Sequence, residues 1–184
     1  RENPTRKLTA ILLLGGSEGG LPSGPLLTML AARGHPTLSL AYFRAPGLPQ
    51  TLENIPLEYF QRALLWLRAQ PQVDPDRIVV LGVSFGSQAA QLLGVHYPSL
   101  VSAVVASVPS NVATCGIPCS GPAWTFEGRP VPYTREFNDP SPQDDPDAVT
   151  PDEQIRGPLF MVCGGLDSAW VSCIYTRAIM SRLA

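Results

Sequence analysis

The sequence predicts an α/β protein in which a mostly parallel sheet is flanked by helices. Short apolar runs of strand length alternate with segments of helical periodicity. A Gly-x-Ser-x-Gly motif joins one of these runs to a helix. The chain has 184 residues, 45% of them hydrophobic, which suits one domain with a sizeable core. We therefore expect a single α/β domain over residues 1–184.

The most informative stretch runs from Ile78 to Gly94. Ile78 to Leu81 are aliphatic without interruption, as is typical of a strand buried on both faces, and helix formers follow the motif. Gly82 and Gly86 permit a tight turn between strand and helix, with the Ser84 hydroxyl held above the sheet. This conformation favours a role for Ser84 as a nucleophile. An ordinary tight turn is the alternative.

The helix that follows Ser84 begins with free backbone amides and a positive dipole end. The Phe85 amide is therefore a candidate donor to an oxyanion. A second donor is expected from the glycine-rich loop, residues 15–20, which follows the apolar strand Leu8–Leu14. We choose the Ser17 amide, with Glu18 as a candidate substrate contact. The loop matches no nucleotide-binding motif, because Leu21 stands where a P-loop has lysine.

The remaining elements complete the alternation of strands and helices. Apolar residues at helical spacing, Leu57 to Leu67, predict an amphipathic helix over Leu57–Gln70. The other expected elements are a helix over Ser23–Ala32 ended by Gly34, and strands over Pro36–Ala41, Ser102–Ala106 and Leu159–Cys163.

Residues 109–158 differ from the rest of the chain. They hold ten of the 20 prolines and show little periodicity, which indicates a long, lid-like excursion. Trp124, with Phe126 and Tyr133, is a candidate contact for an apolar substrate, or else pins the segment to the domain. The acidic stretch Asp139–Glu153 lacks the spacing of a calcium-binding loop, so we expect a solvated loop there.

A serine nucleophile needs a base and an acid that orients the base. Asp167 follows the Leu159–Cys163 strand, where α/β-hydrolases carry their acid; a turn-stabilising aspartate is the alternative. His35 and His96 are the only histidines and neither fits, since His96 is roughly 18 Å along the helix from Ser84. The chain stops at Ala184 inside an amphipathic helix, with Cys173, Arg177 and Met180 in register. We therefore expect the final strand and its histidine loop to be missing.

The four cysteines form two close pairs, Cys115/Cys119 and Cys163/Cys173. Disulfides are favoured over free thiols, and the spacing does not provide a tetrahedral metal site. We expect no metal or cofactor. A net charge of −2 and a pI near 5.6 argue against nucleic-acid binding, and no apolar run is long enough to span a membrane.

Several stretches resemble a known family. They are residues 19–21, 38–42, 56–60 (Pro-Leu-Glu-Tyr-Phe), 82–86, 155–158 and 164–170, the last ending in Asp-x-x-Trp. The sequence resembles the C-terminal catalytic domain shared by acyl-CoA thioesterases and bile acid-CoA:amino acid N-acyltransferases, within the dienelactone-hydrolase-like α/β-hydrolases. The resemblance implies that Ser84 is the nucleophile and Asp167 the acid, and makes Trp170 a candidate substrate contact.

The resemblance also sets expectations about the whole protein. Mammalian members place an immunoglobulin-like sandwich before this domain, whereas about seven residues precede the first strand here, so we expect that domain to be absent or removed. The paired cysteines look more like bacterial relatives. They favour a bacterial, extracytoplasmic protein, with a cytoplasmic location as the alternative.

Three functions remain open at this point. The first is a serine hydrolase or acyltransferase that acts on thioesters or esters through a Ser84 acyl-enzyme. The second is a carboxylesterase or lactonase with the same fold and chemistry. The third is a non-catalytic binding module that retains the fold. The expected partner is a small acyl ester or thioester, and the oligomeric state is left open.

Overall fold

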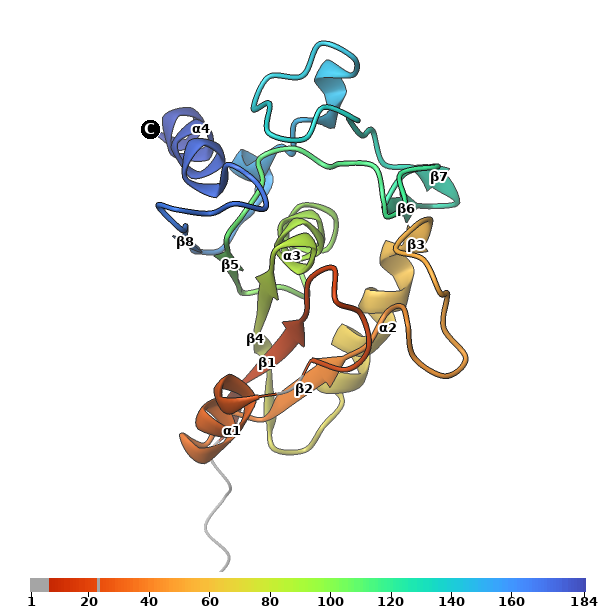
Figure 1. Ribbon diagram of the computed structural model, residues 1–184. Helices are drawn as coiled ribbons and strands as arrows, with labels where there is room; N and C mark the ends of the chain where they lie inside the picture. Colours follow the sequence, from red (N-terminus) through yellow and green to blue (C-terminus); the bar gives the residue numbers. More distant parts are fainter. Residues whose placement is uncertain (1–6, 23) are drawn as a thin grey trace, which may run out of the picture.

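Five parallel strands form the main sheet in a computed structural model that describes residues 7–22 and 24–184. Their order across the sheet is β2-β1-β4-β5-β8, and every neighbouring pair is parallel (Figure 1). The strands are β1 (Leu8–Leu14), β2 (Thr37–Leu40), β4 (Val73–Val83), β5 (Ala103–Ser107) and β8 (Leu159–Val162). The predicted α/β class with a mostly parallel sheet is confirmed.

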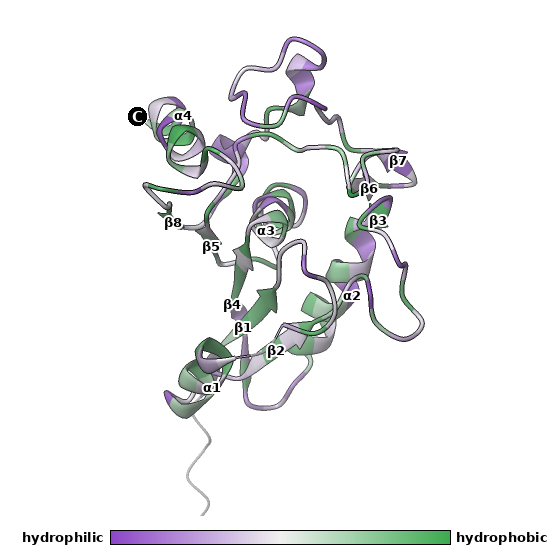
Figure 2. Ribbon diagram, in the orientation of Figure 1, coloured by the Kyte–Doolittle hydropathy of each residue, from purple (hydrophilic) through white to green (hydrophobic). Residues whose placement is uncertain are grey.

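The central strands are apolar because both of their faces are covered. From Ala10 to Leu14 every residue of β1 is buried, and β1 pairs with β2 on one side and β4 on the other. Figure 2 shows β1 in the green of hydrophobic residues. Continuous aliphatic runs are what two covered faces require, since no position on such a strand points to water.

Within the described residues, four α-helices flank the sheet, namely α1 (Pro25–Ala32), α2 (Leu57–Arg68), α3 (Phe85–His96) and α4 (Ser172–Leu183). The apolar residues that predicted α2, from Leu57 to Leu67, form its buried face. The expected start of α1, Ser23, lies outside the described residues, as does the polar lead-in 1–6.

The last helix is present, but the face that carries Cys173, Arg177 and Met180 is not the one that the protein buries. Tyr175 and Ile179 form the buried side of α4, whereas Met180 is 58% exposed and Arg177 is exposed. The reason is that α4 packs through Tyr175 against Trp170 and Val112, which lie in segments that the helical periodicity does not include.

After β1 the chain forms β2 on one side of that strand and later forms β4 on its other side. From β1 it moves outward to β2, and then crosses back so that β4 lies against the opposite edge of β1. In an open parallel sheet, ligands bind at the carboxyl ends of the strands where the strand order reverses. The end of β1 and the end of β4 are therefore the place to look for a site.

Residues 109–158 pack onto the domain through short elements of their own. Strands β6 (Trp124–Phe126) and β7 (Arg129–Pro130) form a second sheet with β3 (Ile55–Pro56), and two short 3₁₀-helices follow, η1 (Pro146–Ala148) and η2 (Asp152–Gln154). Within the segment Trp124 is 1% exposed, and its indole NH donates to Gln88 of α3 at 3.1 Å. Trp124 therefore pins the segment to the domain.

The acidic stretch is not solvated throughout. Asp152 is 1% exposed and is paired with Arg182 of α4, and Asp144 accepts hydrogen bonds from Thr134 and Arg135. Partners from distant segments, which the local composition does not reveal, account for this difference from the expected solvated loop.

Both predicted disulfides are present. Cys115 is bonded to Cys119 and Cys163 to Cys173, each with Cα atoms 5.0 Å apart. None of the helices in the described part of the chain has the length and apolar character needed to cross a membrane.

Candidate active site

Ser84 lies at the turn between β4 and α3, as the motif predicts. It is half-buried and has φ 55° and ψ −123°, a conformation that a non-glycine residue adopts only when its surroundings enforce it. Its amide donates to the Ser107 carbonyl at the end of β5 at 3.0 Å, and its carbonyl accepts from the Ser87 amide at 2.8 Å. These bonds fix the residue at the carboxyl end of the central strands.

Both glycines of the motif are required by the space around them. A Cβ atom on Gly82 would lie 1.9 Å from the Gly86 carbonyl oxygen. A Cβ atom on Gly86 would lie 2.4 Å from the Gly15 oxygen and 2.6 Å from the Leu14 oxygen. Only glycine lets α3 begin this close to both β4 and the end of β1.

The loop after β1 reaches the Ser84 turn through Gly16. A Cβ atom on Gly16 would be 3.0 Å from the Ser84 Cβ and 3.3 Å from the Val83 carbonyl oxygen, so the loop packs closely against this turn. The Gly16 amide donates to the Glu18 carboxylate at 3.0 Å. Ser17, whose amide we chose from the sequence as the second oxyanion donor, is exposed, and its role stays a prediction.

Tyr42 supports this loop through its hydroxyl group. Its hydroxyl donates to the Gly15 carbonyl at 2.6 Å and lies 3.3 Å from the Gly16 carbonyl oxygen. Burial, together with the nearby Glu18 charge, raises the pKa of the Tyr42 hydroxyl far above its ordinary value, so Tyr42 remains a neutral donor. No local pattern in the sequence predicts Tyr42 at this site, because its contact with Gly15 spans 27 residues.

Asp167 lies in the loop between β8 and α4, and its carboxylate is oriented by three donors. The Ser172 hydroxyl donates to Oδ2 at 2.7 Å, and the amides of Ala169 and Trp170 donate to Oδ1 at 3.0 and 3.3 Å. The Ser172 hydrogen bond is the main cause that lowers the pKa of Asp167 below its usual range, with smaller contributions from the two amides. The Asp167 carboxylate is therefore fixed in orientation and ionised at neutral pH.

Trp170 connects the Asp167 loop to the Ser84 turn. Its ring lies 5.7 Å, centroid to centroid, from that of Phe85, and its indole NH donates to the Val108 carbonyl at 3.1 Å. Trp170 is only 5% exposed. The structure therefore gives it a packing contact that joins the Asp167 loop to the Ser84 turn. Contact with a substrate stays a prediction.

Neither histidine lies at this end of the sheet. The Nδ1 atom of His35 lies 3.2 Å from the carbonyl oxygen of Thr9, near the start of β1 and at the opposite edge of the sheet. His96 is the last residue of α3, where its ring stacks on Phe126 at 4.1 Å. Burial lowers the pKa of His96, against the opposing effect of Glu58 and Glu127.

No metal site accompanies these residues. Across residues 7–22 and 24–184, no three His, Cys, Asp or Glu side chains come together as metal ligands.

Comparison with known proteins adds to this geometry. The family model described as "BAAT / Acyl-CoA thioester hydrolase C terminal" matches residues 55–119, which include the Ser84 turn. Acyl-coenzyme A thioesterase 6 of Mus musculus is 33% identical over 182 residues, covering 94% of this chain and 43% of the mouse protein. The chain belongs to this family.

A second relative also matches nearly the whole of this chain. Acyl-coenzyme A amino acid N-acyltransferase 2 of Rattus norvegicus is 28% identical, over 94% of this chain and 44% of the rat protein. The chain therefore spans less than half the length of these relatives. Both are mammalian, so the bacterial origin expected from the cysteine pairs finds no support in them.

A solved structure supports the fold of this family member. A thermophilic esterase from Thermogutta terrifontis superposes with a TM-score of 0.59 and 19% identity, over 97% of this chain and 70% of the esterase. At this identity the likeness shows the α/β-hydrolase fold alone.

Proposed function

We propose that this chain carries out acyl transfer from a thioester or ester through an acyl-enzyme formed on Ser84. The observation that carries the proposal is the strained Ser84 turn at the carboxyl end of β4, with the Asp167 loop packed beside it through Trp170 and Phe85. The names of the thioesterase and N-acyltransferase relatives support a thioester as the substrate and water or an amine as the acceptor.

The reaction would proceed in two steps. The Ser84 oxygen attacks the carbonyl carbon as a base removes the hydroxyl proton, and the carbonyl oxygen becomes an oxyanion. Backbone amides at the start of α3 and in the loop after β1, those of Phe85 and Ser17 in our prediction, would stabilise this charge. The thiol or alcohol then leaves with the proton, and water or an amine releases the acyl group from Ser84.

We propose that the base is a histidine outside residues 1–184. His35 and His96 lie away from the Ser84 turn, while Asp167 is ionised and oriented as the partner of an imidazole would be. Without this base the chain should retain only the acceleration, about 10³ to 10⁴ over water, that oxyanion stabilisation and binding provide in serine hydrolases.

Two alternatives use the same residues. An ester or lactone could replace the thioester, because the Ser84 chemistry is the same for both. A binding module without catalysis is the other alternative, and it is favoured by the position of the two histidines.

Intact-mass analysis after treatment with a fluorophosphonate tests the nucleophile. We expect a single adduct on Ser84, formed faster in the presence of added imidazole, which supplies the missing base from solution. The Ser84→Ala variant should form none, and Ser120→Ala, which changes an exposed serine, should label like the parent chain. Absence of an adduct with imidazole present would favour the binding module.

A further inference from the structure

The peptide unit between Gly15 and Gly16 is held from two sides. The Tyr42 hydroxyl donates to the Gly15 carbonyl at 2.6 Å, and the Gly16 amide donates to the Glu18 carboxylate at 3.0 Å. The carbonyl and the amide of a trans peptide unit point in opposite directions, so the two contacts agree on one orientation of this unit. The Gly16 amide therefore points away from Tyr42 and towards Glu18.

The Glu18 carboxylate lies close to the Ser84 turn. Gly16 is buried, and a Cβ atom on it would be 2.9 Å from Glu18 Oε2 and 3.0 Å from the Ser84 Cβ. The carboxylate thus occupies an amide of the loop that is expected to stabilise an oxyanion. Gly16 suits that role better than Ser17, because Ser17 is exposed to water.

A carboxylate in this position opposes the proposed reaction in two ways. It already accepts the hydrogen bond that the Gly16 amide could give to a substrate, and hydrogen bonds to a charged acceptor are about twice as strong as neutral ones. Its negative charge would also repel an oxyanion that forms beside Ser84. The carbonyl oxygen of a substrate can therefore use the Gly16 amide only after Glu18 has moved.

The Glu18 side chain is able to move at low cost. It is exposed, and within residues 7–22 and 24–184 it accepts one hydrogen bond, that from Gly16, and forms no ion pair. Water replaces most of the free energy of such a bond when an exposed side chain swings away.

Arg44 offers a second position for the displaced carboxylate. Its side chain runs past Gly19, the residue after Glu18, because a Cβ atom on Gly19 would be 2.8 Å from the Arg44 Cβ and 3.0 Å from its Cδ. Arg44 is exposed and forms no ion pair with another described residue; its guanidinium carbon lies 5.6 Å from the ring centroid of Phe43. A positive charge without a carboxylate partner therefore lies next to Glu18.

We propose that the Glu18 side chain is an autoinhibitory latch with two positions. In the closed position its carboxylate caps the Gly16 amide. In the open position it pairs with Arg44 and leaves this amide to the oxyanion of the substrate. The proposal rests on the proposed acyl transfer at Ser84 and adds a means of regulating that site.

The rate at which a neutral ethyl fluorophosphonate labels Ser84, with imidazole added, tests the latch. The Ser84 oxygen bonds to phosphorus, fluoride leaves and imidazole takes the proton, while negative charge develops on the phosphonyl oxygen. Glu18→Ala should label about fivefold faster than the parent chain, because the cap and its charge are gone. Glu18→Gln, which retains a neutral cap, should lie between the two.

Glu136→Ala is the matched control for these variants. Glu136 is also exposed, and its carboxylate accepts one backbone amide, that of Gln143, at the same distance of 3.0 Å. It lies in the proline-rich segment, so its removal should leave the labelling rate unchanged.

The possible results separate the latch from the proposed function. Equal rates for Glu18→Ala and the parent chain would overturn the latch and leave the function in place. Slower labelling of Glu18→Ala would also overturn it, since Glu18 would then orient the Gly16 amide for the reaction. If neither the parent chain nor any Glu18 variant labels, the proposed function fails and the latch fails with it.

A double-mutant cycle tests the open position. Arg44→Gln should slow labelling of the parent chain about two- to threefold, because the displaced carboxylate loses its partner, and should have no effect on Glu18→Ala. Arg44→Lys retains the charge and should label like the parent chain. Equal slowing in both backgrounds, or no slowing in either, would overturn the pairing of Arg44 with Glu18.

The NMR signal of the Gly16 amide reports the latch without reference to rates. Glu18→Ala should move its proton resonance upfield, whereas the Gly20 amide of the same loop, which donates to the Phe43 carbonyl at 2.9 Å, should change little. Labelling of Ser84 in the parent chain should also shift the Gly16 signal, because the phosphonyl oxygen replaces the carboxylate. A Gly16 signal that is unchanged by labelling would overturn the proposal, since this amide would then not serve the oxyanion.

Discussion

The backbone at Ser84 depends on its two neighbouring glycines. A side chain at either position would meet backbone atoms, which cannot move aside as the end of a flexible side chain would. The positive φ of Ser84 is therefore imposed by the contact of α3 with β4 and β1.

Replacement of Gly82 by alanine should destabilise the protein severely. The added methyl group would lie 1.9 Å from the Gly86 oxygen, so strand and helix must separate, and we expect a loss of about 3 kcal/mol or more in the free energy of unfolding. Gly165→Ala is the control, because no atom lies within 4 Å of its added Cβ. Urea unfolding of both variants should show a large shift for the first and one within about 0.5 kcal/mol for the second.

The Ser172 hydroxyl holds the Asp167 carboxylate in place. It donates to Asp167 at 2.7 Å and accepts from the Gly164 amide at 3.2 Å, so it ties the start of α4 to the loop that carries Asp167. Ser172 itself is fully buried at the first turn of α4.

Loss of this hydroxyl should change the titration of Asp167. In Ser172→Ala the main cause of its lowered pKa is gone, so the pKa should rise towards the ordinary value of an aspartate. Ser168→Ala, an exposed neighbour in the same loop, should leave it unchanged. Carbon-13 NMR titration of the Asp167 carboxyl group measures both, and equal pKa values in the two variants would contradict this role of Ser172.

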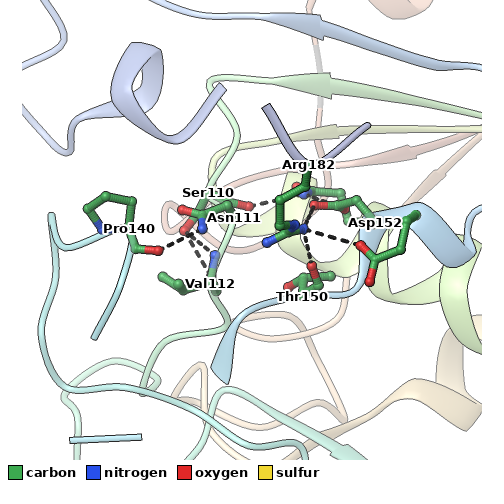
Figure 3. A network of polar contacts seen from close by, with 9 residues as sticks. Ser110, Asn111, Val112, Pro140, Thr150, Asp152 and Arg182 are labelled. Atoms are coloured by element: carbon green, nitrogen blue, oxygen red, sulfur yellow. Dashed lines mark hydrogen bonds and ion pairs between the residues drawn. The ribbon is translucent and has the colours of Figure 1, made fainter. Parts of the chain in front are cut away.

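At the scale of elements, a polar network around the buried side chains of Gln91 and Asp152 ties α3, α4 and η2 together (Figure 3). Arg182 near the end of α4 contacts Asp152 of η2 at 3.1 Å, and also donates to the Thr150 carbonyl. The Gln91 amide of α3 donates to Asp152 at 2.9 Å and to the Ser110 carbonyl at 3.0 Å. The network anchors the returning end of the proline-rich segment against α3.

Asp152 makes the stability of this network depend on pH. Burial raises the pKa of Asp152 to about 6, against the lowering effects of the Gln91 hydrogen bond and the Arg182 charge. The folded protein therefore binds this proton more tightly than the unfolded chain, whose value is 3.8. The stabilising contribution of the protonated form is complete below about pH 4 and is lost as the pH rises through about 6.

Asp152→Asn should remove this dependence. The stability of the parent chain relative to the variant should fall by about 2 to 3 kcal/mol between pH 4 and pH 7, measured by urea unfolding. Glu153→Gln is the matched control, because Glu153 is 53% exposed and lies 3.7 Å from the same Arg182 nitrogen. A constant difference between parent and Asp152→Asn across this range would show that Asp152 does not titrate there.

At the scale of the whole molecule, the disulfides constrain two separate loops. Cys163–Cys173 spans 10 residues and encloses the Asp167 loop, while Cys115–Cys119 spans 4 residues within the proline-rich segment. A longer closed loop removes more conformational freedom from the unfolded chain.

Removal of Cys163–Cys173 should therefore cost more stability than removal of Cys115–Cys119. By loop-closure entropy we expect losses of about 3 and about 2 kcal/mol in the free energy of unfolding. The double serine variants of each pair, compared by urea unfolding, measure the two contributions. The opposite order would indicate that contacts in the folded state, and not loop length, decide the effect.

Much of the fold was predictable because it depends on interactions between residues that are close together in the chain. Aliphatic runs predicted β1, β4, β5 and β8, and the apolar periodicity predicted α2. Each of these patterns reflects which faces of its own element are buried. The strand, turn and helix around Ser84 were predictable for the same reason. Gly82 and Gly86 act on neighbouring backbone, and no distant residue has to be known.

Other features depended on residues far apart in the chain. The buried face of α4 is Tyr175 and Ile179 because Trp170 and Val112 cover it, and no pattern within the helix encodes that neighbour. The burial of Trp124 likewise depends on Gln88, 36 residues away.

By itself, the sequence determined the parallel α/β sheet, the strand–turn–helix at Ser84, the loop that carries Asp167 and the two cysteine pairs. Only the tertiary structure placed Gly16 against Ser84 and Asp152 in contact with Gln91, 61 residues away. The physical reason is that steric limits and periodicity act between near neighbours along the chain. Burial and pKa depend instead on which distant segments the fold brings together.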